Sequence, residues 1–179
     1  MLPIFVYHPD PISTGSIQRS DATCRCCEQP RGYIYTGPVY AEEEFDEALC
    51  PWCIADGSAA QRFSAEFTDS AGVGGYGEWP DVPEAVIWEV SQRTPGFSGW
   101  QQERWWTCCN DAGQFLGPAG HDELTGRWPE AIPVIEMESG LDKHQWATYF
   151  GELNREYGPT AYVFRCRHCG QLGGYSDFP

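Results

Sequence analysis

The sequence predicts a small α+β protein that is organised by zinc. Eight of the nine cysteines fall into four close pairs, which are Cys24/Cys27, Cys50/Cys53, Cys108/Cys109 and Cys166/Cys169. Only 41% of the residues are hydrophobic, but 15% are aromatic, so we expect a small core built on rings and held together with the help of metal. We expect a treble-clef-like half over residues 1–75 and a zinc-ribbon-like half with two or three helices over residues 76–179, which can pack as one domain.

Length and charge limit the possible functions. A chain of 179 residues is long enough for one sizeable domain or two small ones. Its net charge is −15, and its eleven basic residues are widely scattered. Because a phosphate-binding surface needs clustered lysine and arginine, nucleic acid is disfavoured as the partner. The excess acid is compatible with solubility or with a basic protein partner.

The N-terminal segment Met1–Pro11 does not resemble a signal peptide. It has no basic region, and His8 and Asp10 interrupt its short apolar run. No other stretch approaches the roughly 18 apolar residues that a membrane span needs. We therefore expect a cytoplasmic protein without a membrane span. Thiols are reduced in the cytoplasm, where paired C-x-x-C motifs more often bind metal than form disulfides.

The first half is expected to hold short strands and one helix. Residues 1–23 predict a short opening strand followed by an irregular loop through Ser13–Asp21, because prolines punctuate the segment. Ring and β-branched residues around Gly37-Pro38 predict a hairpin over residues 32–40. The acidic run Glu42–Glu47 is interpreted as a solvated turn. Apolar residues at helical spacing predict a helix of two to three turns over residues 54–67.

The glycine-rich segment 71–77 is interpreted as a flexible connection between the two halves. It lacks the Gly-Lys-Ser/Thr ending of a phosphate-binding loop. After it, Pro83 predicts the first position of a helix that ends at Arg93, before Pro95-Gly96. A strand is expected to enter the Cys108-Cys109 doublet.

The C-terminal region is expected to add one helix and two strands. Trp146, Phe150, Leu153 and Tyr157 form one apolar stripe, which predicts a helix over residues 141–157. Strands are predicted over residues 160–165 and 172–178. The knuckle formed by Cys166–Cys169 connects them.

The first two C-x-x-C pairs predict one shared zinc ion. The order knuckle, hairpin, knuckle, helix places Cys50 and Cys53 in the first turn of a helix, where the positive end of the helix favours thiolate. Cys24 and Cys27 supply the other two sulfurs from a loop, which is the treble-clef arrangement. Cys26 could replace Cys24, but its separation from Cys27 makes that chelation awkward, so we expect it to be unliganded.

A redox function for Cys50-Pro51-Trp52-Cys53 is the alternative for this motif. A C-x-x-C pair at a helix start is also the thioredoxin-type arrangement, in which a lowered pKa activates one thiol. However, no βαβ pattern surrounds it, and another C-x-x-C pair lies upstream. These observations favour metal ligation.

The sequence does not decide which residues bind a second metal ion. Cys166 and Cys169 resemble a zinc-ribbon knuckle, and Cys108 and Cys109 are the remaining cysteines that could join them. Adjacent strand residues point in opposite directions, so both bind one ion only if the backbone turns at Asn110-Asp111. Otherwise one of them binds, and another side chain completes the site; the candidates are Asp111, His121 and His168. We expect one to two zinc ions per chain.

The segment Phe97–Trp106 is the candidate for a functional surface without metal. It combines aromatic, amide and arginine side chains, the mixture enriched in interaction hot spots. Its candidate partner-binding residues are Trp100, Gln101, Gln102 and Arg104. The same rings could instead belong to the core.

Several motifs together resemble the CbrC family of bacterial proteins. The resemblance covers nearly the whole chain, from Tyr7–Pro11 to Phe164–Gly170, and is most specific at Cys50-Pro-Trp-Cys-Ile-Ala-Asp-Gly-Ser-Ala-Ala60. The family takes its name from a colicin-tolerance protein. The resemblance implies a bacterial cytoplasmic protein connected with colicin tolerance or envelope stress, and it supplies no catalytic residues.

The sequence thus favours a non-enzymatic protein with structural zinc that presents an aromatic and acidic surface to a protein partner. No common hydrolase or metalloprotease motif appears in the chain. The alternative hypothesis is a zinc-dependent or thiol-based enzyme, in which one cysteine cluster is incomplete and serves as the active site.

Overall fold

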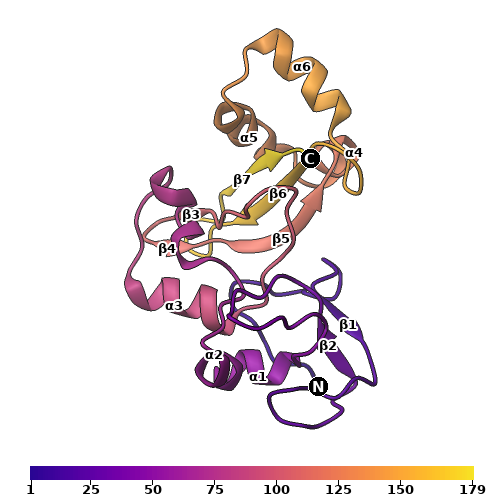
Figure 1. Ribbon diagram of the computed structural model, residues 1–179. Coiled ribbons are helices and arrows are strands. Elements are labelled where there is room, and N and C mark those ends of the chain that lie inside the picture. The colour runs from indigo at the N-terminus through magenta and orange to yellow at the C-terminus, as the bar shows by residue number, and fades with distance from the viewer.

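The computed structural model describes residues 1–179 and shows an α+β architecture, as the sequence predicts. The N-terminal part contains a two-stranded sheet and two short helices. In Figure 1 it lies below a three-stranded sheet, and three further helices cover the far end of that sheet. None of the helices is long and apolar enough to cross a membrane.

The N-terminal sheet pairs β1 (Ile17–Arg19) with β2 (Tyr33–Tyr35) in antiparallel register, with Ile17 opposite Tyr35. The predicted hairpin over residues 32–40 is therefore wrong, as is the placement of a loop over Ser13–Asp21. Gly37 does not turn a hairpin but makes room for Tyr35: a Cβ atom at Gly37 would lie 2.5 Å from the Tyr35 hydroxyl oxygen.

The helix predicted over residues 54–67 is divided into α1 (Pro51–Ala55) and α2 (Ser58–Phe63). Gly57 separates them because its φ angle of 79° is left-handed, a conformation that ends a helix and favours glycine. The early start of α1 follows from Pro51, which occupies a first-turn position where its missing N–H costs nothing.

The glycine-rich segment 71–77 is anchored to the second half. The Trp105 amide donates to the Gly72 carbonyl at 2.9 Å, and the Gly74 amide donates to the Trp105 carbonyl at 3.0 Å. Two short 3-10 helices, Ser70–Gly72 and Gly75–Gly77, flank this contact. The interpretation of the segment as a flexible connection is not supported by this anchoring. A boundary between residues 75 and 76 stays a prediction.

The helix predicted after Pro83 is confirmed as α3 (Glu84–Arg93). The hairpin of β3 (Thr107–Cys108) and β4 (Asp111–Ala112) follows and carries the cysteine doublet. A larger antiparallel sheet has the order β5-β6-β7. β6 (Thr160–Arg165) and β7 (Leu172–Asp177) confirm the two predicted C-terminal strands.

Strand β5 (Gln114–Ala119) was not expected, because Gly117 and Pro118 lie within it. It is an edge strand, where proline is tolerated, and its register with β6 shifts between Phe115 and Gly117. The helix predicted over residues 141–157 is the shorter α6 (Lys143–Glu152). It ends before Tyr157, which is 72% exposed.

Two further helices, α4 (His121–Arg127) and α5 (Ile132–Ser139), were not predicted. They pack with α6 through a buried cluster that includes Leu124, Ile135 and Trp146. A second buried cluster lies nearer the N-terminal part and is dominated by rings, with Phe97 stacked on Phe115 at a centroid distance of 4.0 Å. The third surrounds the first set of cysteines.

Candidate metal centres

The structure brings Cys24, Cys27, Cys50 and Cys53 together, with all four sulfur atoms within 4.8 Å of one another. The Cys24–Cys53 and Cys27–Cys50 sulfur distances are both 3.9 Å, and the Cys50–Cys53 distance is 3.6 Å. A tetrahedral zinc ion with sulfur ligands at about 2.3 Å has sulfur–sulfur edges of roughly 3.8 Å. The spacing of this first cluster therefore fits one zinc ion.

Two local structures position the four sulfurs. The turn from Cys24 to Glu28 is closed by the Glu28 amide, which donates to the Cys24 carbonyl at 2.8 Å. Cys50 is the N-cap residue of α1, and Cys53 lies within that helix, as the sequence predicts. The Cys50 amide also donates to the Cys24 sulfur at 3.2 Å, which joins the two knuckles.

Cys26 lies outside the first cluster, although it is only one residue from Cys27. Its side chain is 8% exposed, and its sulfur faces the Ser58 hydroxyl oxygen at 3.5 Å. Its carbonyl accepts a hydrogen bond from the Arg62 guanidinium. The structure thus gives Cys26 a packing position between the knuckle and α2.

The close approach of the thiols shifts the pKa values of Cys24, Cys50 and Cys53 in opposite directions. A hydrogen bond from the Cys50 thiol lowers the pKa of Cys24 to about 4, helped by nearby backbone amides and opposed by burial. Burial raises the pKa of Cys53 to about 12, and the hydrogen bond to Cys24 raises that of Cys50 well above its usual range. Without a cation, such a cluster resists carrying more than one thiolate.

The second cluster contains Cys108, Cys109, Cys166 and Cys169, again with all four sulfur atoms within 4.8 Å of one another. The Cys108 sulfur lies 3.6 Å from that of Cys109 and 3.9 Å from that of Cys169. These distances also match the edges of a tetrahedral sulfur site.

An unusual backbone turn allows both adjacent cysteines to join the second cluster. Cys109 and Asn110 have positive φ angles of 55° and 59°, a conformation that non-glycine residues rarely adopt. This turn connects β3 to β4 and places the two sulfurs on the same side. The backbone turn that the sequence allowed at Asn110-Asp111 is therefore present.

The other side chains considered as ligands have different partners. Asp111 accepts hydrogen bonds from the Tyr7 hydroxyl at 2.7 Å and from Arg167 and His168 at 2.8 Å each. His121 begins α4 and lies against Phe150, with ring centroids 4.8 Å apart. Each set of four sulfurs thus comes together without any of these side chains.

Asp111 holds the knuckle of the second cluster from outside. Its side chain is only 8% exposed, and burial raises its pKa, but hydrogen bonds from Tyr7 and His168 outweigh burial and lower the pKa overall. Groups that orient metal ligands from a second layer commonly act in this way. Sequence reasoning missed Tyr7 and Arg167, because Tyr7 lies 104 residues from Asp111 and no local motif joins them.

The two clusters differ in their exposure to solvent. In the first, Cys24, Cys50 and Cys53 are buried, whereas in the second Cys109 and Cys169 are exposed. The first cluster therefore lies inside a core and the second at the surface.

The candidate partner-binding segment is held by internal hydrogen bonds. The Trp100 indole nitrogen donates to the Thr160 hydroxyl at 2.9 Å, and the Gln101 side chain donates to the Phe178 carbonyl at 3.2 Å. Gln102 donates to the Tyr40 hydroxyl, and Arg104 forms ion pairs with two glutamates. Trp100 is nevertheless 43% exposed, so part of its ring faces solvent.

Comparison with known proteins identifies relatives along the whole chain. The UPF0167 protein Mb2317 of Mycobacterium bovis is 51% identical over 180 residues, which cover 99% of this chain and 94% of the relative. The UPF0167 protein PA1536 of Pseudomonas aeruginosa is 42% identical over 178 residues, which cover 99% and 97% of the two chains. No solved structure matches. The profile of an uncharacterised protein family, UPF0167, matches residues 2–178, and the chain belongs to that family.

Proposed function

We propose that this chain is a non-enzymatic zinc-binding protein, in which each tetracysteine cluster holds one structural Zn²⁺ ion. The supporting observation is the convergence of eight sulfur atoms into two sets with spacings suited to zinc. Sets made only of thiolates are soft donors, which select zinc over the hard cations magnesium and calcium.

A structural function follows from the number and position of the ligands. Four thiolates fill the tetrahedral coordination of zinc and leave no place for a water molecule. In the first cluster the ion would lie next to a core that contains Ile17, Tyr35 and Ile54. In the second it would join the β3–β4 hairpin to the β6–β7 hairpin. Both ions would therefore stabilise the fold.

Elemental analysis of protein purified without chelator tests the proposal. We expect two zinc ions per chain when both clusters are loaded, and at least one after prolonged purification. Cobalt substitution should produce the thiolate charge-transfer bands of a four-sulfur site. Zinc-free protein with an unchanged melting transition would contradict the assignment of both clusters, because binding of structural zinc contributes directly to folding.

The difference in burial predicts two rates of zinc release. With excess chelator and a colorimetric zinc indicator, we expect a fast phase from the second cluster, whose Cys109 and Cys169 are exposed, and a slower phase from the first. A Cys109→Ser variant should lose the fast phase and keep the slow one. A single phase that releases both ions together, or loss of the slow phase in this variant, would show that exposure does not govern release.

The exposure of Cys109 and Cys169 also favours a second candidate function, a thiol-based or zinc-dependent enzyme with the second cluster as its active site. In that case one sulfur would leave the metal or remain free as a nucleophile. X-ray absorption at the zinc edge distinguishes the two functions, since the enzyme requires three sulfurs and one oxygen at one site.

The proposal extends to partner and location. The net charge of −15 and the exposed face of Trp100 suit a protein partner with basic groups and disfavour nucleic acid. Nine cysteines without a disulfide suit the cytoplasm. The resemblance to CbrC proteins connects the chain with colicin tolerance or envelope stress. Comparing the colicin sensitivity of cells with and without intact cysteine clusters tests this connection.

A further inference from the structure

We propose that a groove between the N-terminal part and the three-stranded sheet binds a small aromatic carboxylate. The groove consists of two neighbouring cavities of about 120 Å³ and about 200 Å³. Ser98, Pro118 and Tyr162 line both cavities, so the two lie next to each other. None of the eight clustered cysteines lines either cavity, and the groove is therefore independent of the metal centres.

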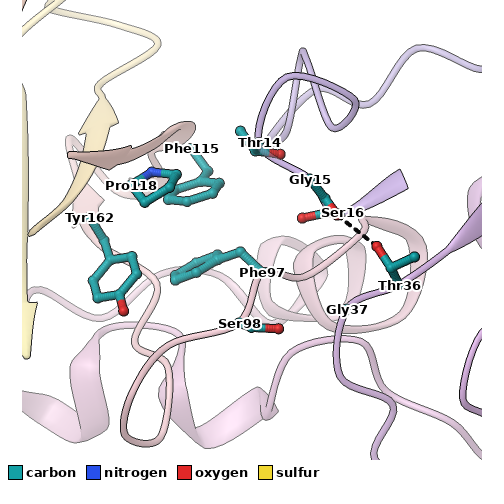
Figure 2. Close-up of a pocket in the computed structure, with 10 residues that line it drawn as sticks. All are labelled: Thr14, Gly15, Ser16, Thr36, Gly37, Phe97, Ser98, Phe115, Pro118 and Tyr162. Atoms are coloured by element: carbon teal, nitrogen blue, oxygen red, sulfur yellow. Dashed lines mark hydrogen bonds between the residues drawn. The ribbon is translucent and has the colours of Figure 1, made fainter. Parts of the chain in front are cut away.

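The smaller cavity has the size and the walls to accept one aromatic ring. Figure 2 shows Phe97, Phe115, Pro118 and Tyr162 on one side, facing residues 14–16 and 36–37 on the other. An engineered cavity of ~150 Å³ in another protein binds benzene, so about 120 Å³ is close to the space that a six-membered ring needs. The aromatic rings of this wall suit contact with a bound ring.

One hydroxyl that lines the smaller cavity, that of Ser16, forms no hydrogen bond within the protein. Ser16 lines the cavity and is only 4% exposed, yet its hydroxyl has no hydrogen-bond partner within the protein. The neighbouring hydroxyls are already engaged: Thr36 donates to the Gly15 carbonyl at 2.6 Å, and Thr14 contacts a nitrogen of His8 at 2.7 Å. Because the Ser16 hydroxyl lines the cavity and can both donate and accept, it can form a hydrogen bond with a polar atom of the ligand.

The larger cavity supplies one cation and one flat ring. It is lined by Arg155 and by Trp100, whose indole is fixed by its hydrogen bond to Thr160. Five of the eleven basic residues form ion pairs with carboxylates, and three others stack over aromatic rings. Arg155 belongs to neither group, and its guanidinium donates only to the Ser13 carbonyl, at 3.1 Å.

The charge of the groove favours a single negative charge on the ligand. One arginine with several free N–H donors suits a carboxylate, which it can bind through two hydrogen bonds. A phosphate dianion would need further cations, whereas Arg155 is the only basic residue that lines the two cavities. The groove therefore fits a ring joined by a short linker to a carboxylate, with the ring beside Phe97 and the carboxylate near Arg155.

Titration with 3-phenylpropionate tests this inference by calorimetry and by ¹H–¹⁵N NMR of the zinc-loaded protein. We expect millimolar or tighter binding, with shifts confined to residues that line the two cavities. The neutral 3-phenylpropionamide should bind at least about tenfold more weakly, because a hydrogen bond to a charged group contributes more than one to a neutral group. Phenyl phosphate should bind no better than the carboxylate.

Three variants separate the groove from nonspecific binding. Arg155→Gln should weaken binding of the carboxylate about tenfold and leave binding of the amide unchanged. Arg19→Gln, which removes an exposed arginine from β1, should change neither. Ser98→Trp, at an exposed position shared by both cavities, should abolish binding while the NMR spectrum stays folded. Absence of binding to the wild type, or equal loss in the two arginine variants, would overturn the proposal.

Discussion

Replacing Cys27 with alanine will remove the first metal ion and unfold the N-terminal part of the protein, whereas Cys26→Ala will do neither. Structural zinc contributes roughly 10–16 kcal/mol in zinc-finger peptides, which is as large as the whole stability of a typical domain, about 5–15 kcal/mol. The first cluster lies in a small core, so little else would compensate for the loss of an ion bound there.

Cys26→Ala and Cys27→Ala make a matched pair of variants. If packing decides the loss of stability, Cys26→Ala is the more damaging change, and if metal ligation decides it, Cys27→Ala is. Cys26 is buried at 8% exposure, while Cys27 is only partly buried, so packing alone would make Cys26→Ala the more damaging change. Ligation would make Cys27→Ala the more damaging change, since Cys27 belongs to the four-sulfur set and Cys26 does not. For Cys26→Ala we expect a cost of about 1 kcal/mol, typical of a small loss of packing.

Zinc content and thermal unfolding, measured on both variants and the wild type, show whether packing or metal ligation decides which variant is the more damaging. Cys27→Ala should lose one zinc ion per chain and the cooperative transition of the N-terminal part. Cys26→Ala should keep the zinc content of the wild type. If the two variants behave alike, the assignment of Cys27 rather than Cys26 as a ligand is wrong.

The local features of the sequence predicted the cysteine geometry well. Each set combines pairs at close spacing, and Cys50 and Cys53 were expected in the first turn of a helix, although the helix begins at Pro51 rather than at residue 54. The strand Thr160–Arg165 was predicted with its observed bounds, because its rings and β-branched residues lie between a Gly-Pro break and a knuckle. These features depend on neighbours in sequence, which a pattern can reveal.

The errors concern contacts between distant segments. Nothing near Tyr33–Tyr35 shows that its partner strand is Ile17–Arg19, before the first knuckle. α4 and α5 are short and carry Gly126 and Pro133, so their helical pattern is weak, and tertiary packing on the sheet decides their conformation. The contact of Tyr7 with Asp111 was not predicted for the same reason, because the two residues are far apart in the sequence.

Two tryptophans five residues apart in the candidate surface segment should respond very differently to truncation. Trp105 is fully buried among Phe97, Phe115 and Phe164, and its indole donates to the Gly113 carbonyl at 2.9 Å. Trp105→Ala should therefore cost ~3–5 kcal/mol, through a cavity and an unpaired carbonyl. In a protein of this size, that cost lowers the melting temperature by about 6–20 °C.

Trp100→Ala is the matched control, because Trp100 is 43% exposed and has a single side-chain hydrogen bond, to Thr160. Combined with Gln101→Ala, it should change the melting temperature by only a few degrees and leave zinc content unchanged, while it abolishes capture of any protein partner that the wild type recovers. Calorimetry and pull-down on the same preparations measure both effects. A fall in melting temperature as large as that of Trp105→Ala would mean that Trp100 acts as a core residue. The surface on which a partner is proposed to bind would then lose its main aromatic anchor.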